Sequence, residues 1–217
     1  MIYALGNSHA HFFTDTHPGV LGIGEKLPHF VSYQGNFKNP QYHHVLAHKF
    51  TERHYPYMIE VINGLNVSAN DYIMFIVGEI DCRWHFPKKI KTRNVSVEHI
   101  LGQTMDQFFP SLRHLKDNGY NVIGWGGHPS TTRGHSDDPD NPIYGDCLTR
   151  NEISLAWNDL LEKQCSKNNM KFVSIVRDLI NDNGLTKMEY FMDDYHLTNK
   201  AMPLVLEKLR SIGIICH

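Results

Sequence analysis

The sequence lacks an excess of charge of either sign. Its 217 residues carry a formal net charge of −2, and aromatic and basic residues do not alternate along any stretch. Proteins that bind nucleic acid usually display a basic surface, and those that bind single strands add aromatic side chains on which bases stack. Neither pattern is present, so we predict no nucleic-acid partner.

Cysteine is scarce, with four residues and no Cys-x-x-Cys pair, which excludes a zinc ribbon and a thioredoxin-type redox motif. We expect reduced thiols, and a single disulfide is the alternative.

Histidine is frequent, with 15 residues, but no His-Glu-x-x-His motif occurs. His44 and His48 are four apart and could share a helix face that holds a metal. Solvated surface histidines are the reading we favour, so we predict neither metal nor cofactor.

Long apolar runs are also missing. No stretch approaches the length of a membrane span, and the N-terminal residues show neither the basic segment nor the apolar core of a secretory signal. We therefore expect a cytoplasmic protein with no membrane partner, and the oligomeric state stays open. Composition does not change along the chain and no repeat occurs, which favours a single domain over residues 1–217.

Short apolar runs and helical patterns alternate along the chain. Five runs read as strands: 2–5, 29–35, 71–78, 121–127 and 171–176. Helical patterns occupy 39–50, 55–64, 97–117, a segment capped by Thr149 and Glu152, and a last segment capped by Thr198. Strands separated by helices predict an α/β protein, a three-layer α/β/α sandwich with a mostly parallel five-stranded sheet.

Polar residues gather where these strands end, and ligands of such sheets bind beyond the carboxyl ends of the strands. The residues at this edge are Ser8, Gly35, Glu79, Asp81, Arg83, His128, Asp193 and His196. The histidines His9, His11 and His85 also follow strands, although each reads better as a hydrogen-bonded loop residue.

Asp193 and His196 stand three residues apart, just before the last predicted helix. In a turn, this spacing lets the carboxylate accept a hydrogen bond from one ring nitrogen and leaves the other free as a base. Such a base could activate Ser8, whose hydroxyl is otherwise a weak nucleophile. A structural cap is the alternative role for an aspartate at this position.

The order of these short blocks resembles the SGNH/GDSL hydrolase superfamily. Gly6-Asn7-Ser8-His9 is similar to the first block of that family, and Asp193-Asp194-Tyr195-His196 is similar to the last. The resemblance implies a flavodoxin-like fold and a catalytic triad of Ser8, Asp193 and His196. It implies a serine hydrolase that needs no cofactor.

Two positions depart from the family pattern. Asn7 replaces the usual aspartate of the first block, and an amide of the same shape can still support the turn. Ile80 stands where the third block normally has an asparagine that donates a hydrogen bond to the oxyanion. Losing one such donor typically costs about 3–4 kcal/mol of transition-state stabilisation.

Arg83, held by Asp81 or Glu79, could replace this donor or bind a substrate carboxylate. The backbone amides of Ser8 and Gly35 would complete the oxyanion hole, with Gly35 as the second-block glycine of the family. A structural salt-bridge network is the alternative reading of these charged residues. His128 is expected to contact substrate.

The sequence thus predicts a serine esterase or deacylase acting on a small-molecule or carbohydrate ester, such as an O-acylated sugar. An acyltransferase of the same fold is one alternative. A non-catalytic carbohydrate-binding or interaction module on a decayed hydrolase scaffold is a second, supported by Ile80. A metal-binding protein that uses the histidines is a third.

Overall fold

The computed structural model describes residues 1–13, 37–38, 45–132 and 143–214. Within them the chain forms a parallel five-stranded sheet with strand order β2-β1-β3-β4-β5. The strands are β1 (Ile2–Gly6), β2 (Phe37–Lys38), β3 (Tyr72–Ile76), β4 (Asn121–Trp125) and β5 (Lys171–Val173). The predicted α/β class and parallel sheet are therefore confirmed.

The predicted strand over residues 29–35 lies outside the described residues, and the described edge strand β2 has only two residues. The first predicted strand, 2–5, extends one residue further to Gly6, whereas the strands predicted over 71–78, 121–127 and 171–176 end two or three residues earlier in the structure. After β3, for example, the chain leaves the sheet at Val77, and Gly78 adopts a φ of +100°, which favours glycine. This early departure leaves the next residues free to form the site.

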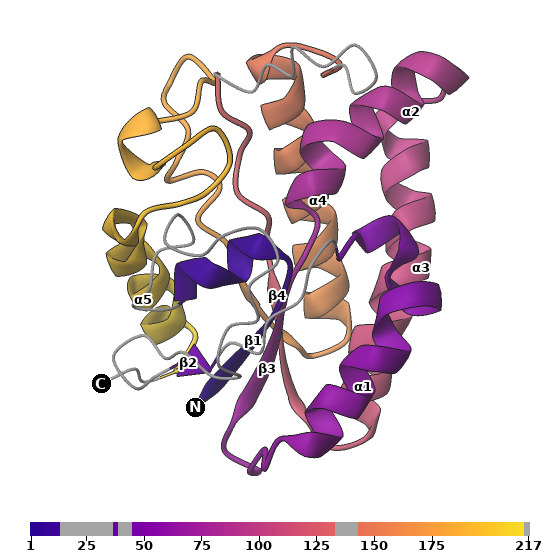
Figure 1. Cartoon of the computed structure of the whole chain (residues 1–217), viewed down its shortest axis with the longest axis vertical. Coiled ribbons are helices and arrows are strands. Elements are labelled where there is room, and N and C mark those ends of the chain that lie inside the picture. Colours follow the sequence, from indigo (N-terminus) through magenta and orange to yellow (C-terminus); the bar gives the residue numbers. More distant parts are fainter. Residues whose placement is uncertain (14–36, 39–44, 133–142, 215–217) are drawn as a thin grey trace.

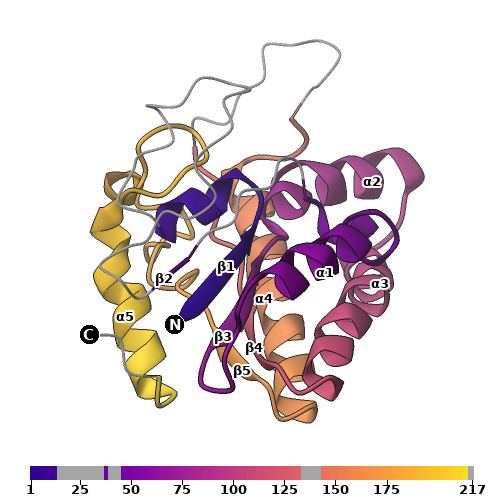
Figure 2. The ribbon, with the colours of Figure 1, turned by 60° about the horizontal axis from the view of Figure 1, so that its bottom comes forward.

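Helices cover both faces of the sheet (Figures 1 and 2). On one face lie α1 (Tyr55–Gly64), α2 (Phe86–Arg93), α3 (Val97–Asp117) and α4 (Cys147–Lys167), and on the other lies α5 (Met202–Ser211). Side chains of β3 alternate between the two cores. Ile73 and Phe75 pack with the four helices, whereas Met74 and Ile76 pack with α5. The three-layer arrangement follows from this alternation.

Three helix predictions need correction. The segment 39–50 is not a helix in its described part, because Val45 and Leu46 are irregular and a 3-10 turn starts only at Ala47. The helix assigned to a Thr149 cap begins at Cys147, and Asp146 is its N-cap, accepting a hydrogen bond from the Thr149 amide at 2.8 Å. Thr198 provides no side-chain cap, because its hydroxyl donates to the Tyr190 carbonyl instead.

No helix of the described residues is both long enough and apolar enough to cross a membrane. Three cysteines, Cys82, Cys147 and Cys165, are free and buried, as expected for reduced thiols, and Cys216 lies outside the described residues. The carboxyl ends of β1, β3 and β4 point to the same edge of the sheet, since all strands are parallel. The candidate site lies there.

Candidate active site

Ser8 stands at the turn from β1 into a short 3-10 helix, Ser8–Phe13. Asn7 shapes this turn, since its side-chain oxygen accepts a hydrogen bond from the His9 amide at 3.0 Å and its amide group donates to the Val45 carbonyl at 3.4 Å. Asn7 is buried, so the turn is fixed from inside. The Ser8 backbone N–H donates to no described residue, and its side chain is partly exposed.

Asp193 and His196 lie on a tight loop closed by an antiparallel bridge between Phe191 and Leu197. One oxygen of Asp193 accepts hydrogen bonds from the backbone amides of Tyr195 and His196, at 2.7 and 2.6 Å. The other oxygen, Oδ2, lies 2.7 Å from His196 Nδ1. The loop thereby fixes the carboxylate against the imidazole of the same segment.

The opposite nitrogen of this imidazole, Nε2, lies 2.9 Å from Ser8 Oγ. Ser8, His196 and Asp193 therefore form one continuous chain of hydrogen bonds. Burial raises the pKa of Asp193, but its hydrogen bonds from His196 and Tyr195 outweigh this effect, and the pKa is lowered overall. The carboxylate is thus charged at neutral pH and accepts a hydrogen bond from Nδ1–H, which leaves the lone pair of Nε2 facing Ser8.

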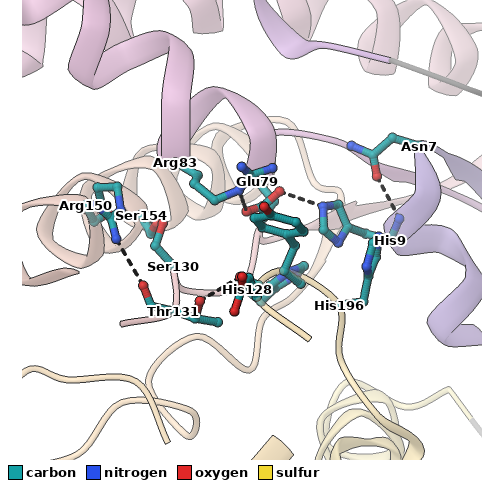
Figure 3. Close-up of polar contacts among 12 residues, drawn as sticks. Asn7, His9, Glu79, Arg83, His128, Ser130, Thr131, Arg150, Ser154 and His196 are labelled. Atoms are coloured by element: carbon teal, nitrogen blue, oxygen red, sulfur yellow. Dashed lines mark hydrogen bonds and ion pairs between the residues drawn. The ribbon is translucent and has the colours of Figure 1, made fainter. Parts of the chain in front are cut away.

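Glu79 is the centre of a second group of charged residues (Figure 3). Its Oε1 accepts a hydrogen bond from Arg83 Nε at 2.7 Å, and its Oε2 lies 2.6 Å from His9 Nε2 as an ion-pair contact. Burial raises the pKa of Glu79, but the positive charge of Arg83 and the contact with His9 hold it well below its usual range. Glu79 therefore links the residue after Ser8 to the guanidinium of Arg83.

His128 lies at the end of β4, where its Nε2 is 2.8 Å from the Tyr195 carbonyl and donates to it. Burial lowers the pKa of His128 to about 3, so the ring is neutral. His9 lies between His128 and His196, with ring centroids 4.5 and 4.9 Å away. Burial also lowers the pKa of His9. The neutral ring of His128 and the ring of His9, which also contacts Glu79, thus pack together beside the imidazole that contacts Ser8.

Among the residues that the structure describes, His9, Glu79 and His128 form a group that could hold a metal, because one ligand atom of each lies within 4.8 Å of the others. His128 also donates its second ring N–H to a carbonyl, as metal-binding histidines commonly do. However, Arg83 already contributes a positive charge 2.7 Å from Glu79. The described contacts therefore form an ion-pair network in which a second cation would meet repulsion.

The predicted site residues are not all brought together. Asp81 contacts neither Arg83 nor the triad, because its buried carboxylate accepts from the Ala47 amide at 2.7 Å and lies 2.5 Å from His48 Nδ1. Of the two carboxylates named in the sequence analysis, Glu79 is the one that pairs with Arg83. His85 packs against His48, away from the site. Gly35, His44 and the side chain of His11 lie outside the described residues.

Tyr195 is a site residue that the sequence analysis did not single out. Its ring lies under the Arg83 guanidinium, with the central carbon of the guanidinium 4.3 Å from the ring centroid. Its only sequence signal is its place between Asp194 and His196. The sequence analysis also did not predict a hydrogen bond that fixes the loop of Asp193 and His196. Thr131 Oγ1 donates to the Asp194 carbonyl at 2.6 Å, which connects this loop to the segment after β4.

Comparison with known proteins gives a structural likeness only. No family model matches the chain, and no curated protein matches it in sequence. Among solved structures, a GDSL-like lipase from Bacteroides thetaiotaomicron is 15% identical with a TM-score of 0.59, over 98% of this chain and 88% of that one. An acetyl xylan esterase is 12% identical with a TM-score of 0.56, over 99% and 100% of the two chains.

A third similar structure is Est24, a carbohydrate acetylesterase from Sinorhizobium meliloti, which is 12% identical with a TM-score of 0.54, over 97% of this chain and 98% of that one. At such identities the likeness concerns the fold. The chain has an SGNH/GDSL hydrolase-like fold, as its two short sequence blocks predict.

Proposed function

We propose that the protein is a serine esterase that removes an acyl group from a hydrophilic alcohol. The observation that carries this proposal is the unbroken hydrogen-bond chain from Ser8 Oγ through both nitrogens of His196 to Asp193, at 2.9 and 2.7 Å. This arrangement of hydroxyl, imidazole and carboxylate performs acyl transfer on several unrelated folds.

In the first step, Ser8 Oγ attacks the ester carbonyl while His196 Nε2 takes its proton. Asp193 keeps the second proton on Nδ1 and stabilises the imidazolium that forms. His196 then gives the proton from Nε2 to the departing alcohol oxygen. The acyl group stays on Ser8 until a water, deprotonated by the same nitrogen, attacks it. The bond between the acyl carbon and Ser8 Oγ then breaks, His196 Nε2 returns the proton to Oγ, and the acid leaves.

The oxyanion formed in each step needs hydrogen-bond donors. The Ser8 backbone N–H is one candidate, because it has no acceptor among the described residues. Gly35 remains our candidate for a second backbone donor. Ile80, at the usual asparagine position, has no group to donate. We therefore expect an oxyanion hole built mainly from backbone amides, and a rate below that of an enzyme with the third donor.

The edge around the triad is polar, with Arg83 and Tyr195 among its residues, and this favours a hydrophilic alcohol over a lipid. Two similar structures are described as an acetyl xylan esterase and a carbohydrate acetylesterase. An O-acetylated sugar is accordingly the substrate class that we propose.

The experiment that tests this function compares Ser8→Ala with wild type on 4-nitrophenyl acetate and on acetylated methyl glycosides. We expect Ser8→Ala to lose at least about 10³-fold in kcat with an unchanged Tm, since the triad acts as a unit. A serine-reactive fluorophosphonate should label wild type at Ser8 alone. Ser166→Ala, which changes an exposed serine of α4, is the matched control. Equal turnover by Ser8→Ala and wild type would remove the serine mechanism.

A further inference from the structure

The guanidinium of Arg83 is held on its edge by a buried carboxylate. Its Nε donates to Glu79 at 2.7 Å, and the two side chains are 17% and 4% exposed. Arg83 follows Glu79 by four residues on one helical turn after β3, so both emerge on the same side of that turn. The contact fixes the near end of the guanidinium beside the buried carboxylate.

The face of the same guanidinium lies on the Tyr195 ring, 4.3 Å from the ring centroid. The hydrogen bond to Glu79 on the edge of the guanidinium and the Tyr195 ring against its face together hold the guanidinium plane in one orientation. Neither Nη atom donates to a described residue. Arg83 therefore presents a pair of N–H donors that have no acceptor among the residues the structure describes, and such a pair can bind a carboxylate through two parallel hydrogen bonds.

A second guanidinium adds positive charge to this region. Arg150 is 4% exposed and close enough for its charge to be felt by Arg83, and no described carboxylate pairs with it. Its Nη atoms donate to the carbonyls of Thr131 and Gly145, while its buried Nε has no partner. Figure 3 shows Arg83 and Glu79 drawn between Arg150 and the histidines of the site. Glu79 pairs with Arg83 alone among the described ion pairs, so the charge of Arg150 is left without a paired carboxylate, although Asp146 and Asp193 also lie near the two arginines. A second, unpaired guanidinium near Arg83 favours an anionic ligand.

The place of Arg83 indicates which part of an ester it meets. Tyr195, on which it lies, directly precedes His196. The oxygen that leaves during acylation must lie beside His196 Nε2 to receive its proton, so the alcohol half of the ester extends along this side. We propose that Arg83 binds an anionic group on the alcohol half of the substrate, which makes that substrate an O-acylated acidic sugar such as a uronate. This inference rests on the proposed esterase function.

A competing role for Arg83 is to bind the oxyanion itself. That role would affect every ester equally, whereas an anion site affects only the charged ones. The test therefore uses two esters that differ at one group: an O-acetylated methyl glucuronide and the matching O-acetylated methyl glucoside, assayed at pH 7. The measured quantity is the ratio of kcat/KM for the acidic ester to kcat/KM for the neutral ester.

We expect this ratio to favour the acidic ester in wild type and to fall about 10- to 100-fold in Arg83→Gln, because charge-assisted hydrogen bonds are lost. Arg83→Lys keeps the charge but not the paired donors, so its ratio should fall by less. Arg177→Gln removes an exposed arginine outside the site and is the control. A ratio that is the same in Arg83→Gln and wild type would overturn the inference and leave the esterase function standing.

If wild type hydrolyses neither ester, the proposed function is wrong, and calorimetry then decides on the anion site. Binding of free glucuronate, but not glucose, that disappears in Arg83→Gln would support the site. No glucuronate binding, or binding that is equal in Arg83→Gln, would overturn it.

Discussion

Ser8 Oγ and His196 Nε2 lie 2.9 Å apart although 188 positions separate the two residues in the sequence. The contact depends on where each segment joins the sheet. β1 lies between β2 and β3, so Ser8 emerges within the carboxyl edge, and the loop from Phe191 to Leu197 reaches the same edge. His196 therefore has one local partner, Asp193, and one distant partner, Ser8.

The two adjacent aspartates of this loop should behave differently. Asp193 accepts three hydrogen bonds, including the one from His196 Nδ1, whereas Asp194 contributes its backbone carbonyl to Thr131. Asp193→Asn should lower kcat about 10³- to 10⁴-fold on an acetate ester, because an amide favours the wrong imidazole tautomer. Asp194→Asn should stay within about threefold of wild type. Steady-state kinetics of both variants checks this, and the reverse order would shift the assignment by one residue.

Glu79→Gln should destabilise the protein far more than the loss of a surface carboxylate. The Glu79–Arg83 pair is 4% and 17% exposed, so removing one charge leaves the other desolvated, at a cost of about 3–5 kcal/mol. The control is Asp159→Asn, which breaks the pair with Arg177, where both side chains are more than half exposed. That change should cost at most about 1 kcal/mol. Urea unfolding measures both, and similar losses would argue against a buried ion pair.

Stability should fall as the pH drops below about 6.5, partly because of His128. Burial lowers its pKa from 6.5 to about 3 in the folded protein. Between these two values the unfolded chain binds a proton that the folded protein does not, so the free energy of unfolding decreases toward acid pH. His128 alone contributes a slope of up to about 1.4 kcal/mol per pH unit. His85, whose pKa burial lowers to about 4, acts in the same direction.

The check compares His128→Asn with wild type by urea unfolding from pH 8 to pH 4. The slope below pH 6.5 should be smaller in the variant, and the two curves should run parallel above pH 7.5. His99→Asn changes an exposed histidine and should keep the wild-type slope. If His128→Asn also kept the wild-type slope, His128 would not be held neutral by burial.

The sequence best predicted the features that depend on residues only a few positions apart. Apolar periodicity located β3 and α3, and the Asp193–His196 pair sits within a single turn. The sequence could not predict whether Glu79 or Asp81 pairs with Arg83, because the choice depends on the chain becoming helical directly after β3. With helical geometry, Glu79 lies one turn before Arg83, while Asp81 turns toward His48.

Other features depend on distant contacts that no local pattern encodes. The pairing of His9 with Glu79 joins residues from the ends of two different strands. The stacking of Arg83 on Tyr195 joins the turn after β3 to a loop more than a hundred residues later. The segment from Ala47 to His54 forms 3-10 and π turns, not one α-helix, and part of it is fixed by Asp81 from outside the segment.

The order of elements along the chain has a consequence for synthesis. All the described strands precede residue 174, whereas the imidazole and its carboxylate come at 193–196. Ribosomes add about 5–20 residues per second, so every described strand is synthesised before the loop that holds His196. A chain that stops before this loop contains the sheet strands and Ser8 but neither Asp193 nor His196. The contact between Ser8 and His196 can therefore form only after all the described strands have been made, which makes the site one of the last parts of the molecule to be completed.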